Sequence, residues 1–211
     1  MKGIGVIAFL FSLLHFSCTQ EASANDSKNT SSADKEVIAL QDAKEWMEEN
    51  KTSLTSTKEM DKIFFRAIYV PSFHNYIAEY GDSLEVDNEK YAEFTKKECY
   101  IFSIGLTSGE GDILKSDASK LPHDLLLDYL AFRVQNDIHL EIDGKSYPCK
   151  LAHFERTYGI KPFFNINLVF DKPDKAGDRK IVYDDRIFET GVVKLNITEE
   201  SLHAVPELKV N

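Results

Sequence analysis

Apolar and polar residues alternate with a period of two in four segments of the chain. This pattern is typical of β-strands, because successive side chains of a strand point to opposite faces of the sheet. In each segment, one set of alternate positions carries large apolar side chains and the other set is more polar. The four segments are 100–106, 138–142, 164–170 and 193–197. We therefore predict four strands that each bury one face.

Three other segments predict strands with a less regular pattern. Residues 62–70, KIFFRAIYV, are apolar on nearly both faces and end at a proline, as expected of a central strand whose continuation cannot donate to the sheet. Segments 147–156 and 179–188 add two more strands. The pair Asp143-Gly144 has the composition of a two-residue type I′ hairpin turn. The chain thus contains about seven predicted strands.

Helical patterns are fewer than strand patterns. Residues 122–134 group leucine and tyrosine on one side, with Pro122 in the first turn, where the missing N–H is tolerated. Residues 86–97 form a second and more polar candidate. Residues 34–49 form a third, in which Trp46 offers the alternative of a short strand. We expect these helices to lie at the periphery.

Strands that cluster in the second half of the chain, with helices inserted early, favour one class of fold. We predict a mainly β domain, an antiparallel β-sandwich with a few peripheral helices, and α+β is the alternative class. No internal repeat is visible. About 175 residues are enough to bury a core without metal or disulfide support, so we expect residues 36–211 to form a single globular domain.

The N-terminus has the features of a cleaved leader. Lys2 precedes an apolar run over 4–14, and Ser17 stands directly before Cys18. The run is too short to span a membrane. This arrangement resembles a bacterial lipoprotein signal sequence, which implies that residues 1–17 are removed and that Cys18 carries a lipid anchor. Thr19 at the next position implies the outer membrane by the same resemblance. Ordinary signal-peptide cleavage nearby is the alternative.

The segment after the anchor has the composition of a flexible tether. Residues 18–35 contain no aromatic or branched aliphatic side chain after the cysteine, so they cannot bury enough surface to offset the entropy of ordering. As a flexible coil, the segment would extend roughly 20 to 25 Å and let the domain reorient above the membrane.

The charge and the missing motifs exclude several classes of function. The chain has 35 acidic and 25 basic residues, and its net charge of −10 repels phosphate backbones, so we expect no nucleic-acid partner. No nucleophile elbow or phosphate-binding loop is present. The carboxylates of 171–185 lack the spacing of a calcium loop, and no two histidines suggest a zinc pair. We predict no catalytic, cofactor or metal site and no enzymatic activity.

Cys99 and Cys149 remain once Cys18 is assigned to the anchor. An extracytoplasmic compartment permits a disulfide between them, which would close a loop of about 50 residues. The alternative is a pair of separate buried thiols that act as small apolar side chains. Neither alternative makes them catalytic, because the chain has no C-x-x-C motif.

Aromatic residues supply the candidates for an interaction surface. The chain contains 14 Phe, nine Tyr and one Trp. Those inside the alternating segments are predicted to lie in the core. The aromatic residues outside the clean patterns, which we predict to form an exposed patch, are Trp46, Tyr76, Tyr80 and Tyr158.

Three stretches, 62–71 (KIFFRAIYVP), 153–162 (HFERTYGIKP) and 183–191 (YDDRIFETG), resemble features shared by uncharacterised lipoproteins of Gram-negative bacteria. The resemblance implies an envelope location and assigns no functional residue. Our leading hypothesis is a non-enzymatic accessory lipoprotein that binds another envelope protein. The alternatives are a carrier of a lipid or small apolar ligand, and a hydrolase with an unrecognised site.

Overall fold

The computed structural model describes residues 35–81, 85–155 and 161–209. Antiparallel strands dominate it, and helices contribute less. This confirms the predicted mainly β class with a few helices. Cys18, Tyr158 and the proposed tether up to residue 34 lie outside the described residues.

The larger sheet has five strands. Their order is β2 (Thr55–Met60), β3 (Ile63–Val70), β4 (Lys97–Leu106), β8 (Phe163–Asp171) and β7 (Leu151–Glu155). Every neighbouring pair is antiparallel. The apolar segment KIFFRAIYV therefore becomes β3, which lies inside the sheet as predicted, and β7 is an edge strand.

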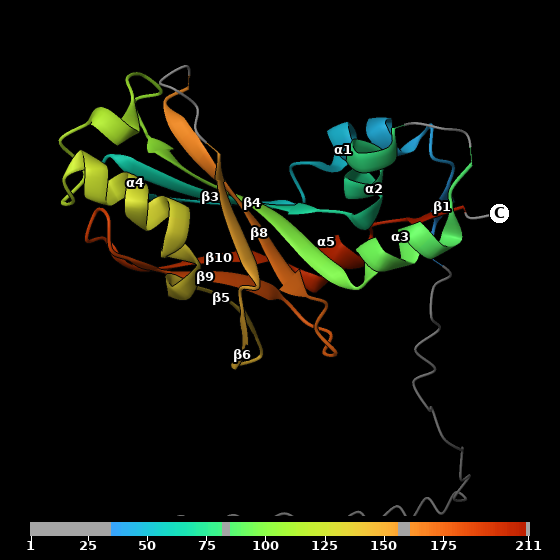
Figure 1. Cartoon of the computed structure of the whole chain (residues 1–211). Helices are drawn as coiled ribbons and strands as arrows, with labels where there is room; N and C mark the ends of the chain where they lie inside the picture. The colour runs from blue at the N-terminus through green and yellow to red at the C-terminus, as the bar shows by residue number, and fades with distance from the viewer. Residues whose placement is uncertain (1–34, 82–84, 156–160, 210–211) are drawn as a thin grey trace, which may run out of the picture. The chain divides into compact units, whose positions relative to one another are not determined.

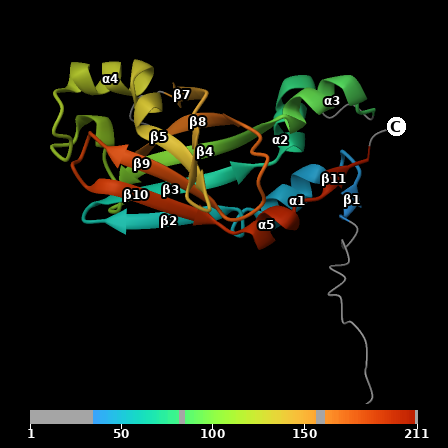
Figure 2. The same ribbon diagram turned by 90° about the horizontal axis from the view of Figure 1, so that it is seen from below.

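The smaller sheet has four strands. Their order is β10 (Gly191–Ile197), β9 (Arg179–Asp185), β5 (Ile138–Ile142) and β6 (Lys145–Pro148). All of its pairs are antiparallel too. The two sheets pack face to face (Figure 2), and β10 runs close to β2 of the larger sheet.

The main core lies between the two sheets. Alternate side chains of β3, β4 and β8, such as Phe65, Phe102 and Ile166, meet Leu140 and Ile181 from the smaller sheet, and all of these are buried. The inward set matches the apolar positions of the alternating segments. Burial of such side chains is the main source of stability of a sandwich.

Helices gather at the two ends of the long strands (Figure 1). At one end lie α1 (Ala43–Asn50), α2 (Ser72–Tyr80) and α3 (Asn88–Thr95), with α5 (Glu199–His203) and the short parallel pair of β1 (Val37–Ile38) and β11 (Glu207–Leu208). At the other end lie α4 (His123–Phe132) and the 3₁₀ turns η1 (Ile113–Lys115) and η2 (Val134–Asp137). Within the described residues, no helix is both long and apolar enough to cross a membrane.

A second core joins the first group of helices to the larger sheet. Leu40, Ala43 and Phe73 pack there with Ile68 of β3. Ile68 points away from the main core, because it alternates with Ala67, which belongs to the main core. The helices thus cover part of the outer face of the larger sheet, which is the face turned away from the smaller sheet.

Two predicted elements are wrong. The predicted strand 147–156 is two strands, β6 and β7, which belong to different sheets and are separated at Cys149 and Lys150. The predicted helix 34–49 is helical only from Ala43, and Val37–Ile38 is strand β1. Strand β2 and helix α2 were not predicted.

The predicted type I′ turn joins β5 to β6. Asp143 and Gly144 both have positive φ, at 44° and 78°. No atom lies within 4 Å of a Cβ built on Gly144. Gly144→Ala therefore tests the backbone alone, and we expect it to lower the free energy of unfolding by about 1 kcal/mol in urea titrations.

Asp143→Asn is the matched control, since asparagine tolerates the left-handed region, and it should leave stability nearly unchanged. Equal losses in the two variants would contradict a purely conformational effect.

Candidate functional site

The outer face of the larger sheet carries a row of polar residues across four adjacent strands. Arg66 on β3 stands opposite Ser103 on β4, Ser103 stands opposite Asn165 on β8, and Asn165 stands opposite Glu155 on β7. Directly opposite residues share a face and have Cβ atoms about 5 Å apart, so these side chains meet. We call these four residues the polar row.

Hydrogen bonds connect the polar row from end to end. Arg66 Nη2 donates to Ser103 Oγ at 3.5 Å, and Ser103 Oγ donates to Asn165 Oδ1 at 2.8 Å. Asn165 Nδ2 donates to Glu155 Oε2 at 3.2 Å, and Asn167 Nδ2 donates to Glu155 Oε1 at 2.6 Å. Ser103 is fully buried although it lies on the outer face.

Two phenyl rings hold the guanidinium of Arg66. Its central carbon lies 5.5 Å from the ring centre of Phe64 and 5.3 Å from that of Phe163. Gly105 stands between the two phenylalanines in the register, and a Cβ there would lie 2.4 Å from a ring carbon of Phe64. The glycine is therefore required for the rings to approach. Burial lowers the pKa of Arg66.

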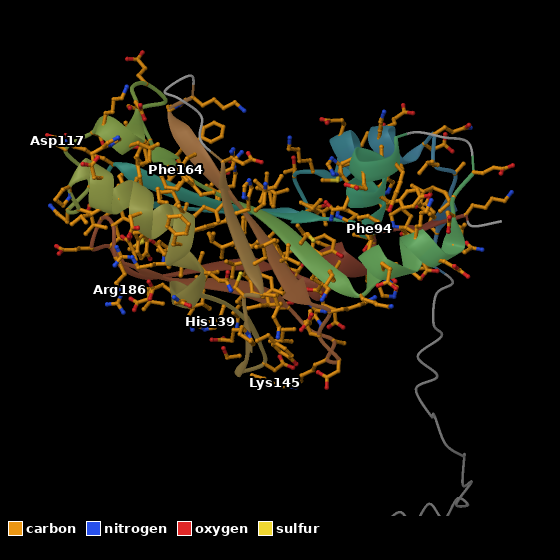
Figure 3. The ribbon with its side chains drawn as sticks, viewed as in Figure 1. Phe94, Asp117, His139, Lys145, Phe164 and Arg186 are labelled. Carbon is orange, nitrogen blue, oxygen red and sulfur yellow. The ribbon has the colours of Figure 1, made fainter. Side chains whose placement is uncertain are left out.

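A groove opens where α2 and α3 overhang the same face. We call it the helix–sheet groove, and its volume is about 630 Å³. Its apolar part consists of Phe94 on α3 (Figure 3) and of Cys99, Val169 and Leu151 on the sheet. Its lining is Asn75, Ala78, Glu79, Glu93, Phe94, Lys97, Cys99, Leu151 and Val169.

The apolar part of the groove reaches the free edge of the sheet. Cys99, Val169 and Leu151 stand opposite one another on β4, β8 and β7. Leu151, on the edge strand β7, is 53% exposed and has Val169 as its one neighbour in this row. An edge strand has unpaired backbone N–H and C=O groups, so together with exposed apolar side chains it can bind a segment of another chain.

The charges at the rim of the groove are mostly negative or already paired. Lys97 lies 2.5 Å from Asp171, and Lys96 lies 2.5 Å from Glu93. Glu79 completes the set of carboxylates in the lining. The groove therefore combines an apolar floor with a rim of two ion pairs and the carboxylate of Glu79.

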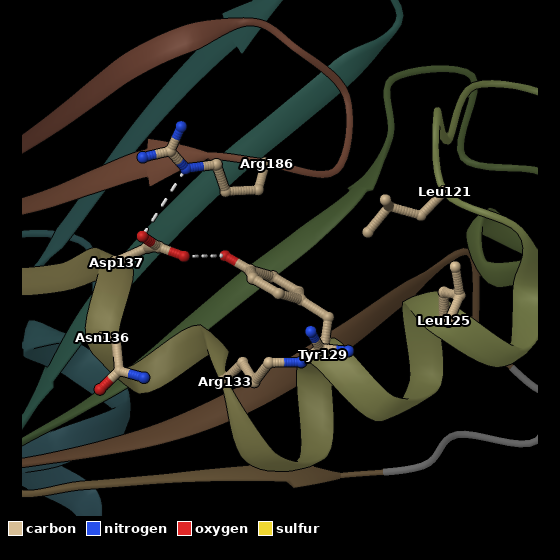
Figure 4. Close-up of a pocket in the computed structure, with 7 residues that line it drawn as sticks. All are labelled: Leu121, Leu125, Tyr129, Arg133, Asn136, Asp137 and Arg186. Carbon is tan, nitrogen blue, oxygen red and sulfur yellow. Dashed lines mark hydrogen bonds and ion pairs between the residues drawn. The ribbon is translucent and has the colours of Figure 1, made fainter.

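A second hollow, of about 400 Å³, lies beside α4 (Figure 4). Tyr129 donates to Asp137 at 2.8 Å, and Asp137 faces Arg186 Nε at 3.7 Å. Arg133, also in the lining, pairs with Asp128. Burial raises the pKa of Tyr129, so its hydroxyl stays a donor at neutral pH. Because each charged group of its lining already has an ion-pair partner, we assign this hollow a structural role.

The two cysteines are free thiols, which corrects the disulfide alternative. Cys99 points to the outer face, whereas Cys149 packs in the main core. Strand β8 runs between them, so their backbones are separated by about two strand spacings, or roughly 10 Å, too far for a disulfide. Burial raises the pKa of Cys149 to about 11 and also raises that of Cys99.

The predicted aromatic patch is not continuous. Tyr76 is 2% exposed and accepts a hydrogen bond from the N–H of Asp87, so its place in an exposed patch is wrong. Trp46 is half-buried and packs edge-on against Phe73. Tyr80 is exposed and packs against Phe94. Tyr158 lies outside the described residues.

The carboxylates of the acidic segment 171–185 mostly form ion pairs or accept hydrogen bonds from the backbone. Asp171 contacts Lys97 and Lys150, and Asp174 contacts Lys145. Asp178 accepts from the N–H of Glu199. In the part of the chain that the structure describes, no three His, Cys, Asp or Glu side chains lie close enough to hold a metal ion.

Sequence reasoning did not single out the polar row or the groove. One signal for the row was present, since Arg66 is the only charged residue within the eight residues of β3. The groove depends on the placement of α2, which the sequence did not predict.

Comparison with known proteins adds no relative. No model of a protein family, no curated protein and no solved structure matches the chain. The function must therefore be argued from the site itself.

Proposed function

We propose that the protein is a non-enzymatic lipoprotein whose domain binds a segment of another envelope protein. The observation that carries this proposal is the helix–sheet groove, an apolar hollow at a free sheet edge with an exposed leucine. Exposed apolar surface with a polar rim is typical of protein interaction sites.

The chemistry of the groove defines the kind of segment that would fit. Phe94, Val169 and Leu151 offer contact to apolar side chains, while Glu79 favours positive charge. The net charge of the whole chain, −10, acts in the same direction. The proposed occupant is a segment of a partner protein with apolar side chains flanked by lysine or arginine.

The anchor and the tether belong to the same proposal. Lipidation at Cys18 would hold the protein at the outer membrane, and residues 19–35 would let the domain search for its partner near the surface. Attachment raises the effective concentration of the domain at the membrane, so a modest affinity would suffice.

A binding role also agrees with the protonation of the two thiols, Cys99 and Cys149. Burial raises the pKa of both thiols, which keeps them protonated and poorly nucleophilic. The space between the sheets is filled by side chains, such as Phe65, Phe102 and Phe164. The carrier alternative, with a ligand enclosed between the strands, therefore finds no support in the space between the two sheets.

Photo-crosslinking in native membranes tests the groove. A photoreactive residue replaces Leu151 in the full chain or, as the matched control, Val192, which is equally exposed at 53% but lies on β10 of the other sheet. We expect a crosslink to one membrane-associated protein from position 151 and none from position 192. The crosslinked peptide should contain apolar residues flanked by basic ones.

Two further variants test the charge of the groove and the lipid anchor separately. Glu79→Lys with Glu93→Lys should reduce the crosslink from position 151 several-fold, because like charges would then face each other. Cys18→Ser should release the chain from the membrane fraction if the anchor is as proposed. Equal crosslinking from 151 and 192, or an acidic crosslinked peptide, would contradict the proposed role of the groove.

A further inference from the structure

Arg66 differs from the other arginines that the structure describes. Arg133 pairs with Asp128, Arg179 pairs with Glu98 and Arg186 pairs with Asp184. Among the described residues, no carboxylate forms an ion pair with Arg66. A partly buried arginine usually has such a partner, because removing its charge from water is unfavourable without one.

The hydrogen bonds of Arg66 are also incomplete. Its Nε is buried and has no acceptor within the described residues, and its contact with Ser103 Oγ is long, at 3.5 Å. The guanidinium carries five N–H donors in a planar fork that matches a carboxylate. The Nε donor is therefore unused, and the Nη2 contact is weak. An anionic acceptor that reached Arg66 would therefore gain contacts without breaking an ion pair.

The one carboxylate of the polar row, that of Glu155, does not reach Arg66. Glu155 is held by Asn165 and Asn167, and two neutral side chains separate it from the guanidinium. Glu155 thus leaves the position beside Arg66 open to an acid from outside the domain.

The surroundings of Arg66 indicate what else the ligand carries. The rings of Phe64 and Phe163 flank the guanidinium and are only partly buried, so they offer apolar surface beside the charge. Lys161 lies over the ring of Phe163 at 5.5 Å and adds a second positive charge.

We propose that Arg66, with Phe64 and Phe163, forms a binding site for a carboxylate attached to a flat apolar group. The planar fork of the guanidinium matches the two oxygens of a carboxylate, and the two rings beside it match a flat apolar group. The site is distinct from the helix–sheet groove, because Arg66 lies four residues, or roughly 13 Å, along β3 from the row of Cys99 and Leu151. It does not rest on the proposed protein partner.

Arginine side-chain NMR tests this site directly. The chain contains five arginines, so ¹⁵N-arginine labelling of the full chain in a non-ionic detergent yields few Nε–H signals. The probes are sodium benzoate, its neutral analogue benzamide, sodium acetate and inorganic phosphate. We expect benzoate to move the Arg66 signal in a saturable way and to bind about tenfold more tightly than acetate or benzamide.

Variants and internal signals supply the controls. The Arg179 signal should not move, because Glu98 already occupies its guanidinium. Phe163→Leu should reduce the preference for benzoate over acetate, and Arg133→Lys should leave binding unchanged. The proposal is overturned if benzoate moves Arg66 no more than Arg133, if benzamide binds as well as benzoate, or if phosphate binds most tightly.

Discussion

Asp185→Ala is expected to destabilise the domain by about 4 kcal/mol, since several buried hydrogen bonds to one carboxylate are lost together. Asp185 is 5% exposed. Its carboxylate accepts from the N–H groups of Ile187, Phe188 and Thr190 at 2.9 to 3.1 Å, and also from the Thr190 hydroxyl and the Tyr183 hydroxyl. Alanine would leave these donors without an acceptor in a buried loop.

The neighbouring residue provides the matched control for this variant. Asp184 is half-exposed and pairs with Arg186 at the surface. Asp184→Ala should cost less than about 1 kcal/mol, as is usual for exposed ion pairs. Chemical denaturation of both variants measures the difference. Similar losses would show that the loop after β9 does not depend on the buried carboxylate.

The second large effect concerns the buried ion pair of Glu98 and Arg179. Arg179 Nη2 donates to Glu98 Oε1 at 2.9 Å, and the Tyr100 hydroxyl donates to Glu98 Oε2 at 2.9 Å. Glu98 is 5% exposed and Arg179 is 8% exposed. Glu98→Ala leaves the guanidinium buried without its counterion, so we expect a loss of about 3 to 5 kcal/mol in the free energy of unfolding.

A double replacement separates the cost of an unpaired charge from the value of the pair. Glu98→Leu with Arg179→Met removes both charges and should recover most of the stability, because apolar residues of similar size replace buried ion pairs well. Lys145→Ala, which breaks an exposed pair with Asp174, is the surface control and should cost less than about 1 kcal/mol. A double variant as unstable as Glu98→Ala would argue that the pair itself stabilises the fold.

Most of the strands that the sequence predicted correctly are those in which one face is buried, and β3, with buried residues on both faces, was predicted from its continuous apolar run. The inward positions of 100–106 and 164–170 are the residues that fill the main core, so the hydrophobic pattern and the packing agree. The turn at Asp143 and Gly144 was predictable because only a few residue types tolerate its backbone angles.

The elements that sequence reasoning missed follow from other causes. Strand β2, TSTKEM, is an edge strand with no buried residue, so it carries no apolar alternation. Helix α2 starts directly after Pro71, and the proline was interpreted only as the end of a strand. The break at Cys149 and Lys150 was missed because both flanking strands are short and similar in composition.

The candidate site was less predictable than the fold. The polar row exists only because the register places Arg66, Ser103 and Asn165 opposite one another, although they are far apart in the sequence. Tyr76 was predicted to be exposed because it lies outside the strand patterns. It is buried because α2 turns that face toward α3 and the second core.

Strands β3 and β4 take part in both cores. Ala67 and Tyr100 belong to the main core, while their neighbours Ile68 and Ile101 pack in or against the second one. The two faces of the same strands therefore couple the sandwich to the helices in a single cooperative unit. Removing α1 to α3 would bare the outer side of β3, so the sandwich is not a separable module that keeps its stability without them.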